Sequence, residues 1–224
     1  MPSFRFEKGC EGTVAGIDEA GRGPLAGPVV AAVAVIDRTV AKRRLLRLID
    51  DSKKLEDEDR EAAYEAMVAS GIVQFAVGEA SVEEIDRINI LQATFLAMRR
   101  ALQALAAAPD IGLPDIVLVD GNRAPPGLGC SARTIVGGDA LSYSIAAASI
   151  FAKVTRDRHM ARLAEAFPGY GWETNRGYGS RQHLEALGRL GPTPHHRMSF
   201  APLKLLGSGL PLWDYVDRLE HDCG

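Results

Sequence analysis

The sequence has little cysteine and no long apolar run. Its three cysteines, Cys10, Cys130 and Cys223, lie far apart and form no Cys-x-x-Cys pair, which argues against a disulfide framework and a zinc ribbon. No stretch is apolar for long enough to span a bilayer, and the N-terminus lacks the apolar segment of a secretory signal. We therefore expect a soluble, cytoplasmic protein with no membrane association.

The chain also lacks an excess of positive charge, since its formal net charge is −3 at pH 7. The charges are unevenly distributed, however. The segment from Lys153 to Lys204 has nine Lys and Arg against four Asp and Glu. A basic segment beside an acidic remainder is compatible with phosphate contacts next to metal-binding carboxylates. Solvated helix faces would give the same pattern, so charge alone does not decide.

The length and composition indicate a folded α/β protein. With 224 residues the chain suffices for one sizeable domain, or for one domain with a small appendage. Hydrophobic residues make up 46% and charged residues 25%, which excludes wholesale disorder. Runs rich in β-branched residues predict strands over 14–18, 29–36, 72–77, 116–119 and 134–136. Helical periodicity predicts helices over 53–69, 142–167, 181–190 and 213–219, and a long one opened by a capping box at 81–84 and running to about 106.

The most informative segment is the end of the first predicted strand. This strand stops on two adjacent carboxylates, Asp18 and Glu19, and Gly21-Arg22-Gly23 follows almost at once. Acids beside a glycine-flanked arginine suit a metal site next to a phosphate or sugar contact. The alternative is a surface turn in which one of the acids caps a neighbouring element.

Two further aspartates occur at the ends of predicted elements. Asp120 follows the strand over 116–119, and Asp139 follows two glycines and precedes the helix over 142–167. If the strands carrying Asp18 and Asp120 are parallel neighbours, their carboxylates meet at one edge of the sheet. Oxygen ligands with no nearby His or Cys suit Mg²⁺ or Mn²⁺ and can hold two ions about 4 Å apart.

Both predictions have limits. Adjacent strand residues point to opposite faces, so Asp18 and Glu19 reach one site only if the strand ends or distorts there. Asp139 taken alone is equally well explained as a helix N-cap.

Asp157 is left out of the predicted metal site, because it lies roughly 20 Å along the following helix. Ligation by His195 and His196 is also disfavoured, and a phosphate contact or a structural role is preferred for them.

The chain resembles bacterial ribonuclease HII, a family of the ribonuclease H-like superfamily. The resemblance rests on seven segments that occur in the family's order and cover nearly the whole chain. They are Gly16–Pro24, Asp51–Leu55, Val119–Asn122, Gly138–Asp139, Ser144–Asp157, Asn175–Gly179 and His196–Phe200. Two departures are Gly137, where relatives often carry lysine, and Met198, where they often carry arginine.

The resemblance implies a metal-dependent endoribonuclease. Such enzymes cleave the RNA strand of RNA–DNA hybrids and cut on the 5′ side of single ribonucleotides in duplex DNA, leaving a 3′-hydroxyl and a 5′-phosphate. It implies catalytic and metal-binding roles for Asp18, Glu19, Asp120 and Asp139 with two Mg²⁺ or Mn²⁺ ions. It places Gly21, Arg22 and Gly23 at the 2′-hydroxyl of the substrate and Tyr178 beside the neighbouring nucleotide. Lys53, Lys54 and Arg197 become candidate phosphate contacts.

The resemblance also implies an architecture. We expect a mixed β-sheet flanked by helices over residues 1–167, and a loop-rich, helical, substrate-binding segment packed on it over 168–224. A monomer acting on RNA–DNA hybrid or ribonucleotide-containing duplex DNA is expected. Two alternatives stay open: a ribonuclease HIII-like enzyme without strong activity on single ribonucleotides, and a noncatalytic junction binder whose acids hold a structural cation.

Overall fold

The computed structural model describes residues 1–52, 54–109 and 111–206 and contains one five-stranded sheet in this part of the chain. The strand order is β3-β2-β1-β4-β5, with β2 antiparallel and β4 parallel to β1, and β5 parallel to β4. The sheet is therefore mixed, as the sequence predicts. Its strands are β1 (Val14–Ala20), β2 (Val29–Ile36), β3 (Val73–Ala80), β4 (Ile116–Asp120) and β5 (Ser131–Ile135).

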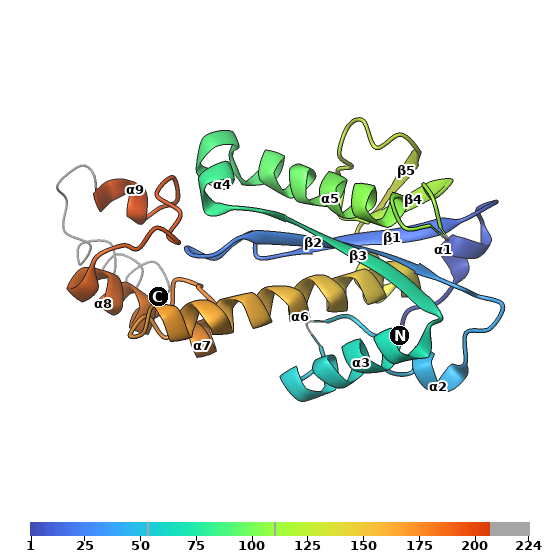
Figure 1. The fold of residues 1–224 in the computed structure, drawn as a ribbon, viewed down its shortest axis with the longest axis horizontal. Coiled ribbons are helices and arrows are strands. Elements are labelled where there is room, and N and C mark those ends of the chain that lie inside the picture. The colour runs from blue at the N-terminus through green and yellow to red at the C-terminus, as the bar shows by residue number, and fades with distance from the viewer. Residues whose placement is uncertain (53, 110, 207–224) are drawn as a thin grey trace, which may run out of the picture. The chain divides into compact units, whose positions relative to one another are not determined.

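Helices precede the first strand, separate β2 from β3 and β3 from β4, and follow the last strand along the chain (Figure 1). Among the helices that the structure describes, none has the length and apolar character needed to cross a membrane. The predicted helix over 213–219 lies outside the described residues. The helices that the structure describes are α1 (Arg5–Lys8), α2 (Arg43–Leu46), α3 (Asp57–Ser70), α4 (Val82–Ile88), α5 (Ile90–Ala106), the 3-10 turn η1 (Gly138–Ala140), α6 (Tyr143–Ala166), α7 (Trp172–Asn175), α8 (Arg181–Leu190) and α9 (Leu203–Leu206).

One predicted helix is divided into two. The capping box forms as expected, because Ser81 Oγ accepts from the Glu84 N–H and the Glu84 carboxylate accepts from the Ser81 N–H. The prediction of a single long helix was wrong, however. Asn89 has a φ of 67°, which ends α4, and its side chain caps α5 by accepting from the N–H groups of Leu91 and Gln92. Apolar periodicity continues across this break and conceals it.

The described chain forms two compact units. The sheet unit comprises Met1–Ala20, Val30–Ala80 and Thr94–Thr155. The helical unit comprises Gly21–Val29, Ser81–Ala93 and the chain from Arg156 onward. Each unit combines segments that are distant in the sequence, whereas the expected division into 1–167 and 168–224 is consecutive and stays a prediction.

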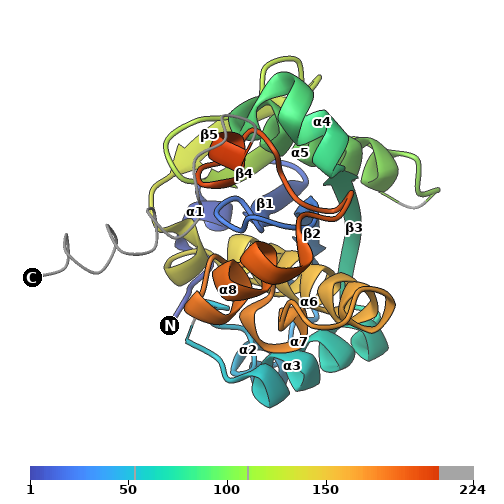
Figure 2. The same ribbon diagram turned by 90° about the vertical axis from the view of Figure 1, so that its left-hand side faces the viewer.

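In the sheet unit, helices cover both faces of the sheet. Figure 1 and Figure 2 show α5 on one face, with α3 and α6 on the other. A Cβ atom at Gly16 of β1 would overlap the main chain of α6 at Ser144 and Ile145. Gly16 therefore lets α6 contact the sheet directly, and the buried residues Ala146–Ala148 continue that contact. This packing fixes the start of α6 against β1.

In the helical unit, a separate apolar core holds the loop that follows β1. Leu25 and Ala26 from this loop pack with Met160 of α6, Trp172 of α7 and Leu184 of α8. Strand-like contacts tie the same loop to the C-terminal segments, since Ala26 pairs with His196 in an isolated antiparallel bridge. The loop is thus part of a packed core and is held in one conformation.

Candidate active site

Asp18 and Asp120 lie on neighbouring parallel strands. In the β1–β4 pairing Ile17 lies opposite Val119. The two aspartates follow these residues, so parallel pairing brings their carboxylates to the same region of the sheet, as the sequence predicts for adjacent strands. Asp18 is only 4% exposed, and its Oδ1 accepts the Glu19 main-chain N–H at 2.7 Å.

Asp139 is brought to these strands by a glycine turn. Gly137 has a φ of 66° and starts the turn η1 that carries Asp139. The N–H of Gly138 donates to Asp120 Oδ1 at 2.6 Å, which ties this turn to the end of β4. Helix α6 is capped instead by Ser142, whose Oγ accepts the Ile145 N–H at 3.3 Å. The alternative of Asp139 as the N-cap of α6 is therefore not needed.

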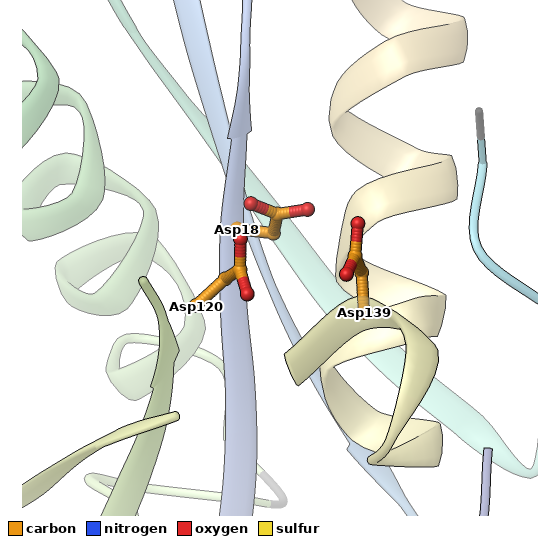
Figure 3. A group of neighbouring side chains, drawn as sticks. All are labelled: Asp18, Asp120 and Asp139. Carbon is orange, nitrogen blue, oxygen red and sulfur yellow. The ribbon is translucent and has the colours of Figure 1, made fainter. Parts of the chain in front are cut away.

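Asp18, Asp120 and Asp139 form a three-carboxylate group, which we call the acidic triad. Each offers one oxygen, and these atoms all lie within 4.8 Å of one another. Figure 3 shows the three side chains converging from β1, from the end of β4 and from the turn before α6. An all-carboxylate donor set of this size fits a hard divalent cation such as Mg²⁺ or Mn²⁺.

The electrostatics of the acidic triad favour such a cation. The pKa of Asp18 is raised well above its usual range, first by burial and then by the negative charges of Glu19 and Asp120. Burying an ionised carboxylate beside other carboxylates is unfavourable unless a positive charge compensates the negative charges. A bound divalent ion would supply that charge and return Asp18 to its ionised form.

Glu19 is not part of the acidic triad. It follows Asp18 on β1 and lies opposite Ala31 of β2, so the alternation of strand side chains directs it to the other face. The strand does not end at Asp18 and Glu19, because β1 continues to Ala20, so the two side chains are not expected to reach one site. Its negative charge still contributes to the raised pKa of Asp18.

Ser149 is a site residue to which the sequence analysis gave no role in the site. Its hydroxyl hydrogen-bonds to Asp18 and lowers the pKa of that carboxyl, opposing the effect of burial. It also hydrogen-bonds to the Ser52 hydroxyl at 2.6 Å, with both side chains buried. Both serines lie in segments that carry the family resemblance, which was the signal available in the sequence. Lys53, the predicted phosphate contact beside Ser52, lies outside the described residues.

The glycines of Gly21-Arg22-Gly23 have different roles in the helical unit. Gly21 is buried with a φ of 91°, and a Cβ there would overlap Nε of Arg156. Its lack of a side chain is therefore required by packing. Gly23 is exposed, and a Cβ there would lie 3.4 Å from Cε1 of Tyr178. Gly23 and Arg22 are thus the members of the motif that are accessible to a ligand.

Tyr178 has an exposed ring and a hydrogen-bonded main chain. Its side chain lies beside Gly23, and the residue is 50% exposed. Its main-chain N–H donates to the Asn175 carbonyl at 2.9 Å, and its carbonyl accepts from the Ser180 N–H at 2.8 Å and from Nδ1 of His183 at 2.8 Å. An exposed aromatic ring held this way resembles a stacking platform more than a core residue.

The remaining predicted phosphate contacts differ in exposure. Lys54 is exposed and forms a 3.7 Å ion pair with Asp51, so its ammonium group is accessible to a phosphate. Arg197 has no exposed surface, and its guanidinium donates to main-chain carbonyls of the loop after β1. Its guanidinium is thus buried against these carbonyls, whereas the resemblance implies a phosphate contact.

His196 has a structural partner, His183, which the sequence argument did not single out. The Thr193 N–H donates to His196 Nδ1 at 2.9 Å, so the proton of His196 is on Nε2 and is donated to His183 Nε2 at 3.0 Å. The Trp172 Nε1–H also donates to His183 Nε2, which leaves the His183 proton on Nδ1 for the Tyr178 carbonyl. These bonds account for both rings in their neutral forms.

Mild acid is expected to destabilise the protein through this pair. Burial and the neighbouring His183 lower the pKa of His196 from 6.5 to about 3. The neutral ring stabilises the fold fully above pH 6.5, and this contribution is lost as the pH falls towards 3, by up to about 1.4 kcal/mol per pH unit. Urea unfolding across this range measures the slope. In His196→Gln the slope is expected to be shallower, and equal slopes in both proteins would contradict the prediction.

The two departures from the family pattern are tolerated for identifiable reasons. Met198 and Ser199 are held through their main-chain N–H groups, which donate to the Asp86 carboxylate at 2.9 and 3.0 Å. The side chain at position 198 is not needed for this contact. Gly137 lies in an open part of its turn with a positive φ, a conformation that glycine adopts without strain.

Comparison with known proteins gives consistent matches along the chain. The family model described as "Ribonuclease HII" matches residues 15–203. "Ribonuclease HII" of Rhodospirillum rubrum is 60% identical over 213 residues, covering 94% of this chain and 95% of that protein. The protein of the same name from Paramagnetospirillum magneticum is 59% identical over 203 residues, covering 91% and 97%. The crystal structure of ribonuclease H2 from Pyrococcus horikoshii OT3 matches with a TM-score of 0.68 at 28% identity, covering 86% of this chain and 95% of that one.

Proposed function

The chain belongs to the ribonuclease HII family, an endoribonuclease H family that acts on RNA–DNA hybrids. On this basis we propose that the protein, in addition to cleaving hybrids, incises duplex DNA at single ribonucleotides. In this proposal it acts as a monomer, on RNA–DNA hybrids and on duplex DNA with an embedded ribonucleotide. The cut falls on the 5′ side of the ribonucleotide and leaves a 3′-hydroxyl and a 5′-phosphate.

The observation that carries the proposal is the pairing of Gly23 with Tyr178. A glycine exposed to solvent allows the main chain to approach a ribose closely enough to hydrogen-bond its 2′-hydroxyl, the group that distinguishes RNA from DNA. The exposed Tyr178 ring beside Gly23 offers an apolar face to the adjacent nucleotide. The Gly23 contact selects a ribonucleotide, and the Tyr178 ring contacts the nucleotide next to it. The two contacts together favour a junction between RNA and DNA.

The position of the cut constrains the chemistry. The 2′-hydroxyl of a ribonucleotide is adjacent to the phosphate on its own 3′ side, so it is not available as the nucleophile for a cut on the 5′ side. Water must attack, and a group has to activate it. The acidic triad suits this task, because its carboxylates are clustered, buried and beside Ser149.

We assign the acidic triad to the binding of Mg²⁺ or Mn²⁺, and we assign Glu19, which the sequence suggested as a fourth ligand, an electrostatic role through its charge near Asp18. Bound divalent ions would activate the attacking water and stabilise the charge on the phosphate and on the departing 3′-oxygen. The residues themselves hold the geometry: the Gly138 N–H orients the Asp120 carboxylate, and the Glu19 N–H orients that of Asp18. No covalent bond between the protein and the substrate is part of this scheme.

Removing the Tyr178 ring tests the proposal. Tyr178→Ala is expected to lower kcat/KM on duplex DNA with one ribonucleotide by about tenfold or more, because stacking of one base contributes about 1–3 kcal/mol. Cleavage of a long RNA–DNA hybrid should fall less, since it offers a 2′-hydroxyl at every position. Tyr178→Phe keeps the ring and should retain activity on both substrates.

The outcome separates function from folding. The ring is half exposed, so thermal stability of Tyr178→Ala should stay close to that of the unmodified protein. A parallel loss of stability and of both activities would assign the ring to folding. Failure of the unmodified protein to cut the single-ribonucleotide duplex with either metal would overturn the proposal itself.

A further inference from the structure

Arg197 is a buried arginine whose hydrogen bonds converge on the loop that carries Gly21-Arg22-Gly23. Its Nε donates to the Gly27 carbonyl at 2.9 Å and its Nη1 to the Arg22 carbonyl at 2.9 Å. Its Nη2 donates to the carbonyls of Gly21 at 2.6 Å, Gly27 at 2.8 Å and Pro28 at 3.1 Å. One side chain therefore holds the carbonyl oxygens at both ends of the loop.

Arg156 is a second buried arginine on the same loop. Its Nε donates to the Pro28 carbonyl at 3.3 Å, and its Nη2 donates to the Ala26 carbonyl at 3.1 Å. The same Nη2 donates to the Arg176 carbonyl at 3.1 Å. Arg176 lies two residues before Tyr178, so Arg156 joins the loop to the segment that carries the exposed ring.

The two segments are joined by main-chain bonds as well. The Leu25 N–H donates to the Gly177 carbonyl at 2.8 Å, and the Gly27 N–H donates to the His195 carbonyl at 2.9 Å. The two arginines thus act on a loop whose inner half is already paired. They add side-chain hydrogen bonds to the carbonyls of Ala26, Gly27 and Pro28 beside these main-chain bonds, and to those of Gly21 and Arg22, which precede the exposed Gly23.

This arrangement is unfavourable for stability taken alone. Both guanidinium groups are almost completely buried, at 1% exposure for Arg156 and 0% for Arg197. Burial and the neighbouring Arg156 lower the pKa of Arg197 to about 9, and burial lowers the pKa of Arg156. Burying two like charges costs free energy, and buried charged groups can be retained for the geometry that they impose. The geometry imposed here is the spacing of Gly23 and Tyr178.

We propose that Arg156 and Arg197 are positioning residues for ribonucleotide selection: together they fix the loop at Gly21–Pro28 and the Tyr178 segment so that Gly23 and the Tyr178 ring face one RNA–DNA junction. This inference rests on the proposed incision at single ribonucleotides. Neither arginine needs to touch the substrate. Both act through the main-chain carbonyls that they hold.

Lysine is the informative substitution at each position. It keeps the positive charge, but its single nitrogen cannot hold several carbonyls that a guanidinium fork spans. Displacement of a positioning loop by about 1 Å can cost about a hundredfold in rate. A single ribonucleotide offers only one 2′-hydroxyl in one register, whereas a long hybrid offers many. The loss should therefore be larger on the single-ribonucleotide duplex.

The test compares Arg156→Lys and Arg197→Lys with the matched control Arg181→Lys. Arg181 is an exposed arginine of the same unit that pairs with Glu185 on α8. For each positioning variant, kcat on the single-ribonucleotide duplex is expected to fall about tenfold or more, with little change in KM. Cleavage of a long RNA–DNA hybrid should stay within about threefold of the unmodified protein, and the control should match it on both substrates.

Two results would overturn the inference. One is an unchanged single-ribonucleotide activity in both positioning variants. The other is an equal loss on both substrates that follows the loss of thermal stability, which would make the arginines purely structural. Amide hydrogen exchange of Leu25 and Gly27, measured by NMR, gives a readout that does not depend on cleavage.

This second readout distinguishes failure of the inference from failure of the proposed function. If the unmodified protein cuts only long hybrids, the proposed function fails. The positioning role is then judged by exchange alone. Faster exchange at Leu25 and Gly27 in the two lysine variants would support it, and exchange equal to that of Arg181→Lys would overturn it.

Discussion

Asp18→Asn is expected to abolish cleavage of RNA–DNA hybrids, with a fall in kcat of about a thousandfold or more. Metal ions stabilise the transition state of phosphate hydrolysis by several kcal/mol, and each 1.36 kcal/mol corresponds to about tenfold in rate. Asparagine has the shape of aspartate but removes the charge at the centre of the acidic triad. Single-turnover cleavage in Mg²⁺ and in Mn²⁺ measures the loss.

The same variant should fold and bind normally. Because burial and like charges raise the pKa of Asp18, replacing it with a neutral side chain should leave thermal stability equal or higher. Asp59→Asn, an exposed substitution in the first turn of α3, serves as the control with full activity. Near-normal turnover by Asp18→Asn in either metal would remove the acidic triad from the mechanism.

Metal replacement distinguishes an enzyme from a binder whose acids hold a structural cation. Ca²⁺ is larger than Mg²⁺ and accepts irregular coordination, so a purely structural site should tolerate it. A site for two-metal phosphate chemistry should bind substrate with Ca²⁺ but cleave it poorly. Full cleavage in Ca²⁺ would argue against the assigned role of the carboxylates.

Gly21→Ala is expected to cause the second large loss, of about a hundredfold in cleavage at single ribonucleotides. Gly21 has a φ of 91°, and a Cβ there would overlap Nε of Arg156 and lie 2.9 Å from the Pro28 carbonyl oxygen. The strained backbone and the overlap together should also cost about 2–5 kcal/mol of unfolding free energy. Steady-state kinetics and urea unfolding measure both effects.

Gly71→Ala is the matched control for backbone strain. Gly71 has a φ of 65° at the end of α3, with open space around it, so alanine there adds strain without overlap. It should lose some stability but keep its activity. If Gly21→Ala were as active as Gly71→Ala, the loop would not need the conformation that Arg156 imposes.

The carboxylates at the strand ends were accessible from the sequence because their physical signal is local. Asp18 and Asp120 each follow a buried apolar run, and parallel pairing of those runs is enough to bring them together. Asp139 was less certain, because a residue before a helix is often its cap. The hydrogen bond from Gly138 to Asp120 decides its position, and no pattern in the sequence indicates that bond.

The predicted mixed sheet flanked by helices is confirmed, and so is the family. The break at Asn89 was missed because apolar periodicity does not register a single left-handed residue. A phosphate contact was expected for Arg197 because the family resemblance implies one. Its burial depends on contacts with residues about 170 positions earlier in the chain, which no local pattern contains.

The ribonuclease HIII-like alternative is now less favoured. The relatives from Rhodospirillum rubrum and Paramagnetospirillum magneticum are named ribonuclease HII and match over nearly their full length. The two alternatives differ in whether the enzyme cleaves efficiently at a single ribonucleotide in duplex DNA. The relation between Gly23 and Tyr178 is therefore the feature that experiments should address.

Mapping the product ends of one substrate tests the central claim most directly. Labelled duplex DNA containing a single ribonucleotide is incubated with the protein and Mg²⁺ or Mn²⁺. The account predicts one cut on the 5′ side of the ribonucleotide, with a 3′-hydroxyl and a 5′-phosphate, absent with Asp18→Asn and with all-DNA duplex. A cut on the 3′ side that leaves a 2′,3′-cyclic phosphate would contradict it, because the 2′-hydroxyl would then be the nucleophile in place of water.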